Sequence, residues 1–142
     1  PLRTQVEIDA LIGAIKEGKI KVLASGHHAQ GIEEKKLQFE QAETGILGLQ
    51  TAFSIAYQTL VATGHISLTR LVELICHEPR KLLGLPAATV EEGGSAELSL
   101  NGEWKLAAKQ IPSRAKNSPY IGQTLKAKVF GIIQKGKFHS AN

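Results

Sequence analysis

The hydrophobic pattern between Thr4 and Gly64 constrains the fold of this chain more than any other feature of its sequence. TQVEIDALIGAIKEGK has apolar residues at helical spacing, with a capping box at Thr4 and Glu7 and a stop at Gly18. IKVLAS is mostly apolar and too short for a helix, so it predicts a buried strand. ILGLQTAFSIAYQTLVATG predicts a second helix, buried on more than one side. Helix, strand, loop and helix make one and a half units of an α/β fold, which cannot close a sheet alone.

Three further segments belong to this helical half. Residues 26–45 are polar and charged without clear periodicity, and they predict a long functional loop. Ser67 can cap a third helix, LTRLVELICH. Pro79 can begin a short fourth helix, PRKLLG.

The pattern changes after Gly84. LPAATVEEGGSAELSL is rich in turn residues and then alternates, NGEW predicts a turn, and WKLAA predicts a strand. LKAKVFGIIQKGKF alternates around Lys135 and Gly136, as a hairpin does. We therefore expect one unit in residues 1–86 and an all-β segment in residues 87–142.

Composition excludes several classes of protein. The 142 residues carry a net charge of only +4, with scattered basic residues and few aromatics, which argues against a nucleic-acid partner. Cys76 is the only cysteine and predicts a buried thiol in a reducing compartment. The sequence has no signal peptide and no apolar stretch of about 20 residues, so we expect no membrane partner and a cytoplasmic location. The start at Pro1 and the absence of methionine suggest a piece of a longer protein.

Gly26, His27 and His28 stand at the end of the predicted strand, where an α/β barrel carries its catalytic groups. Imidazole binds zinc and transfers protons near neutral pH, so both histidines are candidate metal ligands. Adjacent strand residues point to opposite sides, so at most one would face into a barrel unless the strand breaks there. We therefore expect this chain to bind no zinc by itself, and a metal site at the pair is the alternative.

Of two neighbouring motifs, the first has two interpretations. Gly45 and Gly48 bracket an apolar pair and indicate either a turn into a helix or a backbone amide site for an anion. The charged run at residues 33–36 indicates a solvated surface. The remaining histidines lie in a loop, a helix end and the tail, and nothing in the sequence makes them partners.

Six spaced segments resemble, in order, motifs of the dihydroorotases, a family of cyclic amidohydrolases. PLR resembles the end of the family's NPPLR, and LASGHHAQGIEEK stands where the family has a strand ending in DHxPH, a loop and EEK. FEQAETGILGLQTAF resembles FxxAxxGxxGLET, EPRKLLGL resembles NPAKILGL, and AELSL resembles ADLVL. SRAKNSPYIGQTLKAKVFGIIQKGK resembles SKSKNTPFxGxxLKGKVxxTIxxGK. The match covers nearly the whole chain.

The resemblance implies an α/β fold: a TIM (β/α)8 barrel flanked by a small β-sandwich built from both chain ends. Residues 1–86 would be the C-terminal part of the barrel, and residues 87–142 the C-terminal sandwich segment. It also implies interconversion of carbamoyl-aspartate and dihydroorotate by a hydroxide on one or two zinc ions. The last-strand Asp would be a zinc ligand and proton carrier, and the other ligands would precede Pro1.

The family's site positions are altered here. They fall on Gly26 for the Asp, His27 for the first His, Gln30 for the carboxylate-binding second His, and on Ala29, Thr44, Gly45 and Gln50. Gly26 has no group to hold a metal or move a proton. Gln30 can donate a hydrogen bond but carries no charge, while the amide of Gly45 could still meet a carboxylate.

These substitutions predict a dihydroorotase-like protein of pyrimidine biosynthesis that is catalytically impaired and acts as a non-catalytic partner or scaffold. The expected partners are an N-terminal part of the barrel and further copies of the chain. By resemblance, aspartate transcarbamoylase is a third, because some family members without metal ligands are its structural partners. The alternative is an active zinc-dependent dihydroorotase or cyclic amidohydrolase that uses His27 or His28 as a replacement base or acts on a different substrate.

Overall fold

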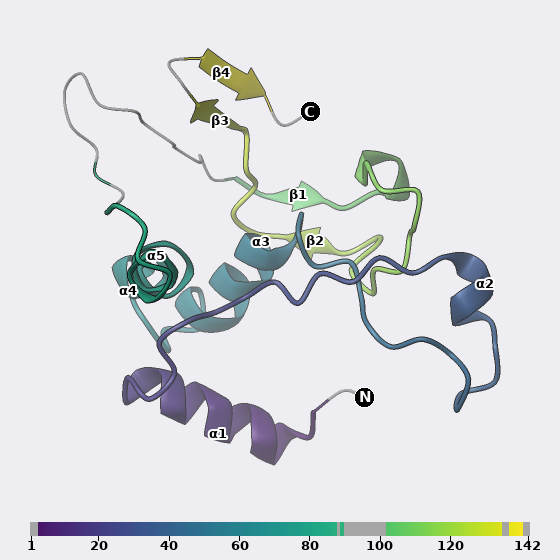
Figure 1. Ribbon diagram of the computed structural model, residues 1–142, viewed down its shortest axis with the longest axis horizontal. Helices are drawn as coiled ribbons and strands as arrows, with labels where there is room; N and C mark the ends of the chain where they lie inside the picture. Colours follow the sequence, from purple (N-terminus) through teal and green to yellow (C-terminus); the bar gives the residue numbers. More distant parts are fainter. Residues whose placement is uncertain (1–2, 88, 90–101, 135–136, 141–142) are drawn as a thin grey trace.

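The computed structural model describes residues 3–87, 89, 102–134 and 137–140 (Figure 1). Most of the helical elements come first, and the strands follow in the last third of the chain with one short helical turn among them. The helical elements are α1 (Gln5–Lys16), α2 (Ile32–Lys35), α3 (Ala52–Ala56), η1 (Tyr57–Val61), α4 (Leu68–Val72), η2 (Glu73–His77), α5 (Glu78–Leu82) and η3 (Ala108–Gln110). The strands are β1 (Trp104–Lys105), β2 (Thr124–Leu125), β3 (Gly131–Gln134) and β4 (Lys137–Ser140).

Helix α1 confirms the local prediction. The Thr4 hydroxyl accepts from the N–H of Glu7 at 3.4 Å, and the Glu7 carboxylate accepts from the N–H of Thr4 at 2.8 Å. This reciprocal pair is the capping box, and the helix ends at Lys16 shortly before Gly18. Its apolar side chains are only partly covered, because Val6 is 79% and Leu11 47% exposed.

The next two helical runs are continuous. Helix α3 leads directly into the π-helical η1, and α4, η2 and α5 form one run from Leu68 to Leu82. The Ser67 hydroxyl accepts from the N–H of Arg70 at 3.1 Å, which confirms the predicted cap. Pro79 does not begin a separate helix as predicted, because α5 follows the wider π-type turn of η2 without a break. Cys76 is half-buried in η2.

Residues 20–25 do not form the predicted strand. This segment is bound to its surroundings by a hydrogen bond from the N–H of Leu23 to the carbonyl of Leu74, at 3.0 Å. A single parallel bridge joins His27 and Ile46 just beyond it. A strand exists only when a neighbour pairs with it, and the described part of the chain has no strand on either side of this segment.

The strands form two small antiparallel sheets rather than a closed barrel within the ranges described. β1 pairs with β2 through Trp104 and Leu125, so the predicted WKLAA strand is present but limited to two residues. β3 pairs with β4, and Gln134 lies opposite Lys137, which confirms the hairpin. The predicted turn at 135–136, residues 90–100 and the first residue of NGEW lie outside the described residues.

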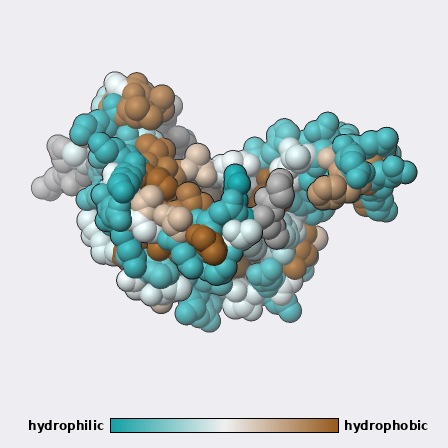
Figure 2. Space-filling view, turned by 90° about the horizontal axis from the view of Figure 1, so that it is seen from below, coloured by the Kyte–Doolittle hydropathy of each residue, from teal (hydrophilic) through white to brown (hydrophobic). Residues whose placement is uncertain are grey.

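Buried apolar side chains form two clusters. The closed core consists of Leu47, Leu106, Ile111 and Leu125, with Ile55, Trp104, Ala115 and Tyr120 packed against it. The open core consists of Ile15, Leu60 and Leu74, with Ile12, Ile20, Leu23 and Ile66 packed against it. Figure 2 views the molecule from below, on the side of α1, and shows apolar side chains at this surface.

Helix length and apolar content also decide whether a helix could span a membrane. Over the ranges that the structure describes, no helix has the length and the apolar content needed to cross a bilayer.

Candidate functional site

Gly26 lies where the extended segment turns. Its φ is +56°, a left-handed conformation, and the N–H of His27 donates back to the Ser25 hydroxyl at 3.3 Å. A Cβ added at Gly26 would meet nothing within 4 Å. The position therefore has room for a larger side chain, and Asp and Asn are among the residues that tolerate this conformation.

The His27 ring binds the turn that precedes α3. Its Nδ1 lies 3.3 Å from the N–H of Gly48 and 3.2 Å from the N–H of Leu49. Both partners are donors, so Nδ1 must accept, and a neutral ring carries its proton on Nε2. The amide of Gly48, which we considered for an anion, is thus used by an imidazole. Gly48 lies close to the main chain at Ser25, because an added Cβ would clash with the Ser25 carbonyl oxygen.

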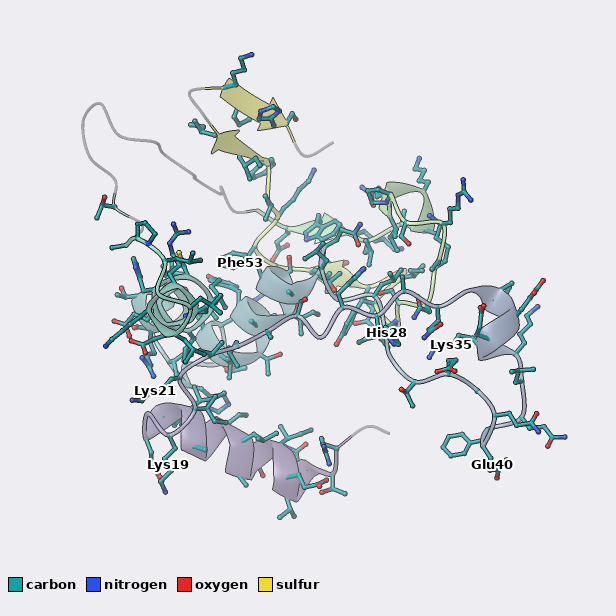
Figure 3. All side chains as sticks on the ribbon, viewed as in Figure 1. Lys19, Lys21, His28, Lys35, Glu40 and Phe53 are labelled. Carbon is teal, nitrogen blue, oxygen red and sulfur yellow. The ribbon has the colours of Figure 1, made fainter. Side chains whose placement is uncertain are left out.

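The His28 ring points to a different group of residues, at the root of the loop that carries α2 (Figure 3). Its Nδ1 lies 3.1 Å from the carbonyl oxygen of Thr44 and 3.2 Å from Nε2 of Gln30. One ring nitrogen can donate to the first or accept from the second, but not both, so the tautomer selects the partner. Gly45, at φ +103°, lies against this ring, and an added Cβ would be 2.6 Å from that of His28.

The sequence-predicted positions therefore divide into two groups. Gln30, Thr44 and Gly45 come together around His28, whereas His27 bonds to the helix start. Residues 33–36 form α2 and its end, with Glu33, Glu34 and Lys36 exposed, as expected of a solvated run. Lys35 donates to the carbonyl of Glu43 at 2.7 Å and so closes the base of this loop.

Asn117 belongs to the site, although the sequence argument did not single it out. Its side chain accepts from the N–H of Gln30 at 3.2 Å and donates to the carbonyls of His28, at 3.0 Å, and Gly45, at 3.3 Å. Asn117 is 72 to 89 positions away from these partners, so no local pattern could reveal the contacts. The one available signal was its place in the KNSP segment that resembles the family.

The residues that the structure describes do not fit a zinc site. Across the described ranges, no group of three or more His, Cys, Asp or Glu side chains could hold a metal ion. Gly26 offers no ligand, and Nδ1 of His27 is occupied by two N–H donors. Because a catalytic zinc needs about three protein ligands, further donors would have to come from outside the described residues.

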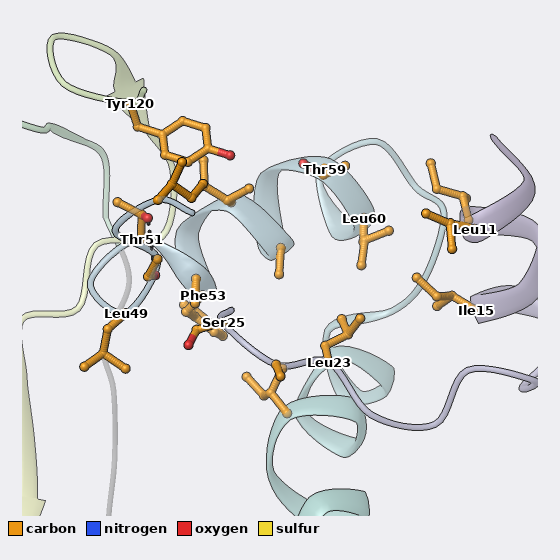
Figure 4. A pocket seen from close by; sticks show the side chains of 18 of the residues that line it. Leu11, Ile15, Leu23, Ser25, Leu49, Thr51, Phe53, Thr59, Leu60 and Tyr120 are labelled. Atoms are coloured by element: carbon orange, nitrogen blue, oxygen red, sulfur yellow. Dashed lines mark hydrogen bonds between the residues drawn. The ribbon is translucent and has the colours of Figure 1, made fainter. Parts of the chain in front are cut away.

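An apolar cavity of about 540 Å³ lies between α1 and the α3–η1 run (Figure 4). Leu11 and Ile15 line it from α1, Thr59 and Leu60 from η1, and Leu23 from the extended segment. Its polar lining is sparse, so it suits apolar side chains better than a charged ligand.

Comparison with solved structures places this fold among the amidohydrolases. The L-hydantoinase (dihydropyrimidinase) from Arthrobacter aurescens matches 99% of this chain with a TM-score of 0.87 and 30% identity. The D-hydantoinase (dihydropyrimidinase) from Thermus sp. matches with a TM-score of 0.85 and 20% identity, which supports the fold alone. Each match covers 33% of the solved chain. The chain thus has the fold of about a third of a hydantoinase-like amidohydrolase.

Sequence comparison gives a narrower relation. The dihydroorotase of Elusimicrobium minutum is 38% identical over 129 residues, which is 89% of this chain and 30% of the relative. Those of Caldicellulosiruptor saccharolyticus and Ruminiclostridium cellulolyticum are 36% identical over 140 residues and 40% identical over 128 residues. The matches cover 33% of the Caldicellulosiruptor protein and 30% of the Ruminiclostridium protein. No protein-family model matches the chain. The chain is a dihydroorotase homologue that spans about a third of these relatives' length.

Proposed function

We propose that this chain is the C-terminal third of a dihydroorotase-like protein of pyrimidine biosynthesis that is catalytically impaired and serves as a non-catalytic partner or scaffold. Gly26 is the observation that carries the proposal. It stands where the resemblance puts the last-strand Asp, which is both a metal ligand and a proton carrier. Losing a general acid–base group typically costs about 10²- to 10⁴-fold in rate, before any loss of metal affinity.

The surroundings of Gly26 support the same interpretation. Nδ1 of His27 is bound by the N–H groups of Gly48 and Leu49, so it cannot act as a base without releasing the helix start. Gln30, at the position of the carboxylate-binding His, contributes an uncharged amide that contacts His28. The substitutions therefore remove both a proton carrier and a charge from the same site.

The open core supports a partner. Leu11 is 47% exposed although it faces the apolar cavity beside Ile15 and Leu60. We propose that residues 1–86 are part of a barrel, that residues 87–142 are part of a β-sandwich, and that an N-terminal barrel portion covers this surface. In the absence of that portion, further copies of the chain would cover it. Aspartate transcarbamoylase is the partner that the resemblance suggests for the assembled protein.

An active zinc-dependent cyclic amidohydrolase is the second candidate. Gly45 is retained, and a Cβ added at Gly26 would meet no other atom within 4 Å, so substrate or a metal held by another segment has room there. In that case His28 would be the replacement base, because its ring binds Thr44 and Gln30 rather than a helix start.

Dihydroorotate hydrolysis by the full-length parent protein, with zinc added, separates the two candidates. We expect no measurable turnover with Gly26 in place. Gly26→Asp restores the family's ligand in a conformation that Asp tolerates, and a gain of activity would show that the rest of the site is intact. Gly26→Asn is the matched control, since it has the same shape without the charge. Turnover of the unaltered protein near an ordinary rate of about 10 per second would refute the proposal.

A further inference from the structure

Asn117 connects two loops of the site that are distant from it in sequence. Its Oδ1 accepts from the N–H of Gln30 at 3.2 Å, and its Nδ2 donates to the carbonyl oxygens of His28 and Gly45. Its own carbonyl accepts from the N–H of Leu47 at 3.2 Å. One half-buried residue thus ties both ends of the His28–Gln30 segment to the segment that contains Gly45.

The chemistry of these partners requires an Asn. The N–H of Gln30 can only donate, so it must meet the amide oxygen. The carbonyls of His28 and Gly45 can only accept, so they must meet the amide nitrogen. An Asp carboxylate has the same shape but would set lone pairs against both carbonyls, and a shorter side chain would reach none of the three.

The segment that carries Asn117 is itself held in place. The Lys116 ammonium donates to the carbonyls of Ile111, at 2.6 Å, and Ser113, at 2.7 Å, and so braces the turns before Asn117. Ile111 and Leu47 are both buried in the closed core, which fixes the segment and the loop it touches to one support. Asn117 can therefore hold the residues that it contacts in a fixed position.

We propose that Asn117 is a positioning residue that holds His28 and Gln30 against Gly45. This inference goes beyond the proposed function, because the geometry is the same whether the site binds a ligand, performs a reaction or only stabilises a scaffold. It makes a specific prediction about the His28 ring. Since Nδ1 can pair with Thr44 or with Gln30, movement of the His28–Gln30 segment changes the partner of that nitrogen.

Amide hydrogen exchange and imidazole ¹⁵N shifts of the full 142-residue chain, in the assembly in which it purifies, test the proposal. In Asn117→Ala we expect exchange at the Gln30 amide to rise about tenfold, as loss of one hydrogen bond implies, and the His28 Nδ1 resonance to shift. Asn117→Asp should keep the Gln30 amide protected while moving the carbonyl ¹³C shifts of His28 and Gly45. Gln123→Ala is the matched control, because that amide donates to the carbonyl of Pro119 in its own segment, at 2.9 Å.

Two outcomes would overturn the proposal. One is Asn117→Ala with unchanged exchange at Gln30 and an unchanged His28 ring. The other is exchange that rises equally in α1, which would mean a general loss of stability. Should Asn117→Ala fail to fold, the isosteric Asn117→Asp decides alone, since unchanged carbonyl shifts at both His28 and Gly45 would count against positioning. None of these measurements depends on dihydroorotase activity.

Discussion

The closed core and the open core contain the same kinds of side chain but differ in what surrounds them. Leu106 and Leu125, in the closed core, are 1% and 0% exposed. The backbone around them is also paired, because the N–H of Leu106 bonds to Gln123 at 3.1 Å and its carbonyl accepts from Gly122 at 2.8 Å. Ile15 and Leu60 are each 6% exposed, but they border a cavity of about 540 Å³.

The difference shows where the chain buries its own apolar surface and where it leaves that surface uncovered. Segments from both halves close around Leu47, and the buried Ser54 hydroxyl links them by accepting from Trp104 and donating to the carbonyl of Ala127. The open core is bordered by α1, where Val6 is exposed and Leu11 remains exposed although it lines the cavity. Burial is worth about 25 cal/mol per Å² of apolar surface, so covering this face would stabilise an assembly.

The largest expected effect concerns association. We expect the 142-residue chain to sediment and scatter light above its monomer mass of 15.3 kDa, because the open core requires a cover. Leu11→Glu should reduce this association by placing a charge beside the cavity, whereas Phe39→Ser, at an 87% exposed residue that does not line the cavity, is the control. A monomer that unfolds in one cooperative calorimetric transition would contradict the distinction between the cores.

Two side-chain truncations, one in the closed core and one beside the cavity of the open core, measure the difference in packing directly. Leu125→Ala should lower the free energy of unfolding by about 2–5 kcal/mol, because it leaves a void among fully buried side chains. Leu11→Ala should cost less than about 1 kcal/mol, because this side chain is 47% exposed beside an existing cavity. Urea titration at one fixed protein concentration, followed by Trp104 fluorescence and by circular dichroism, gives both values. Equal costs would mean that the open core is as well packed as the closed core.

The smallest expected effect is a pH dependence of α1, at the edge of the open core. The pKa of Glu7 is held below its ordinary value of 4.5 by the N–H of Thr4, and additionally by the Thr4 hydroxyl. A lowered pKa means that the stabilisation is fully present above the ordinary value and is lost as pH falls through the folded-state value. We therefore expect Glu7→Gln to lower the helical circular dichroism signal slightly at neutral pH and to match the unaltered chain once the pH has fallen below the folded-state pKa of Glu7. A difference that persists in acid would show that the carboxylate charge is irrelevant to the cap.

Local features could be predicted from the sequence, because the two groups that form each feature lie within a few residues of each other. Thr4 and Glu7 form their capping box, Ser67 caps α4, and β3 pairs with β4, the next strand along the chain. Each of these depends on backbone conformation and on groups that any fold would leave next to one another.

Non-local features differed from the prediction for a related reason. Residues 20–25 have the composition of a buried strand, but pairing is decided by a neighbour, and the described chain places none beside them. The second helix was expected to begin near Ile46 but begins at Ala52, because the residues before it bond to His27, His28 and Asn117 instead.

The candidate site combines both kinds of information. Residue identity alone reveals that Gly26 lacks a ligand and that Gln30 lacks a charge, because these are properties of the side chains and do not depend on the fold. The fold decides that His27 serves the helix start, that His28 faces Thr44 and Gln30, and that Asn117 holds them. The physical reason is that a hydrogen bond between residues 89 positions apart exists only after the closed core has brought their segments together.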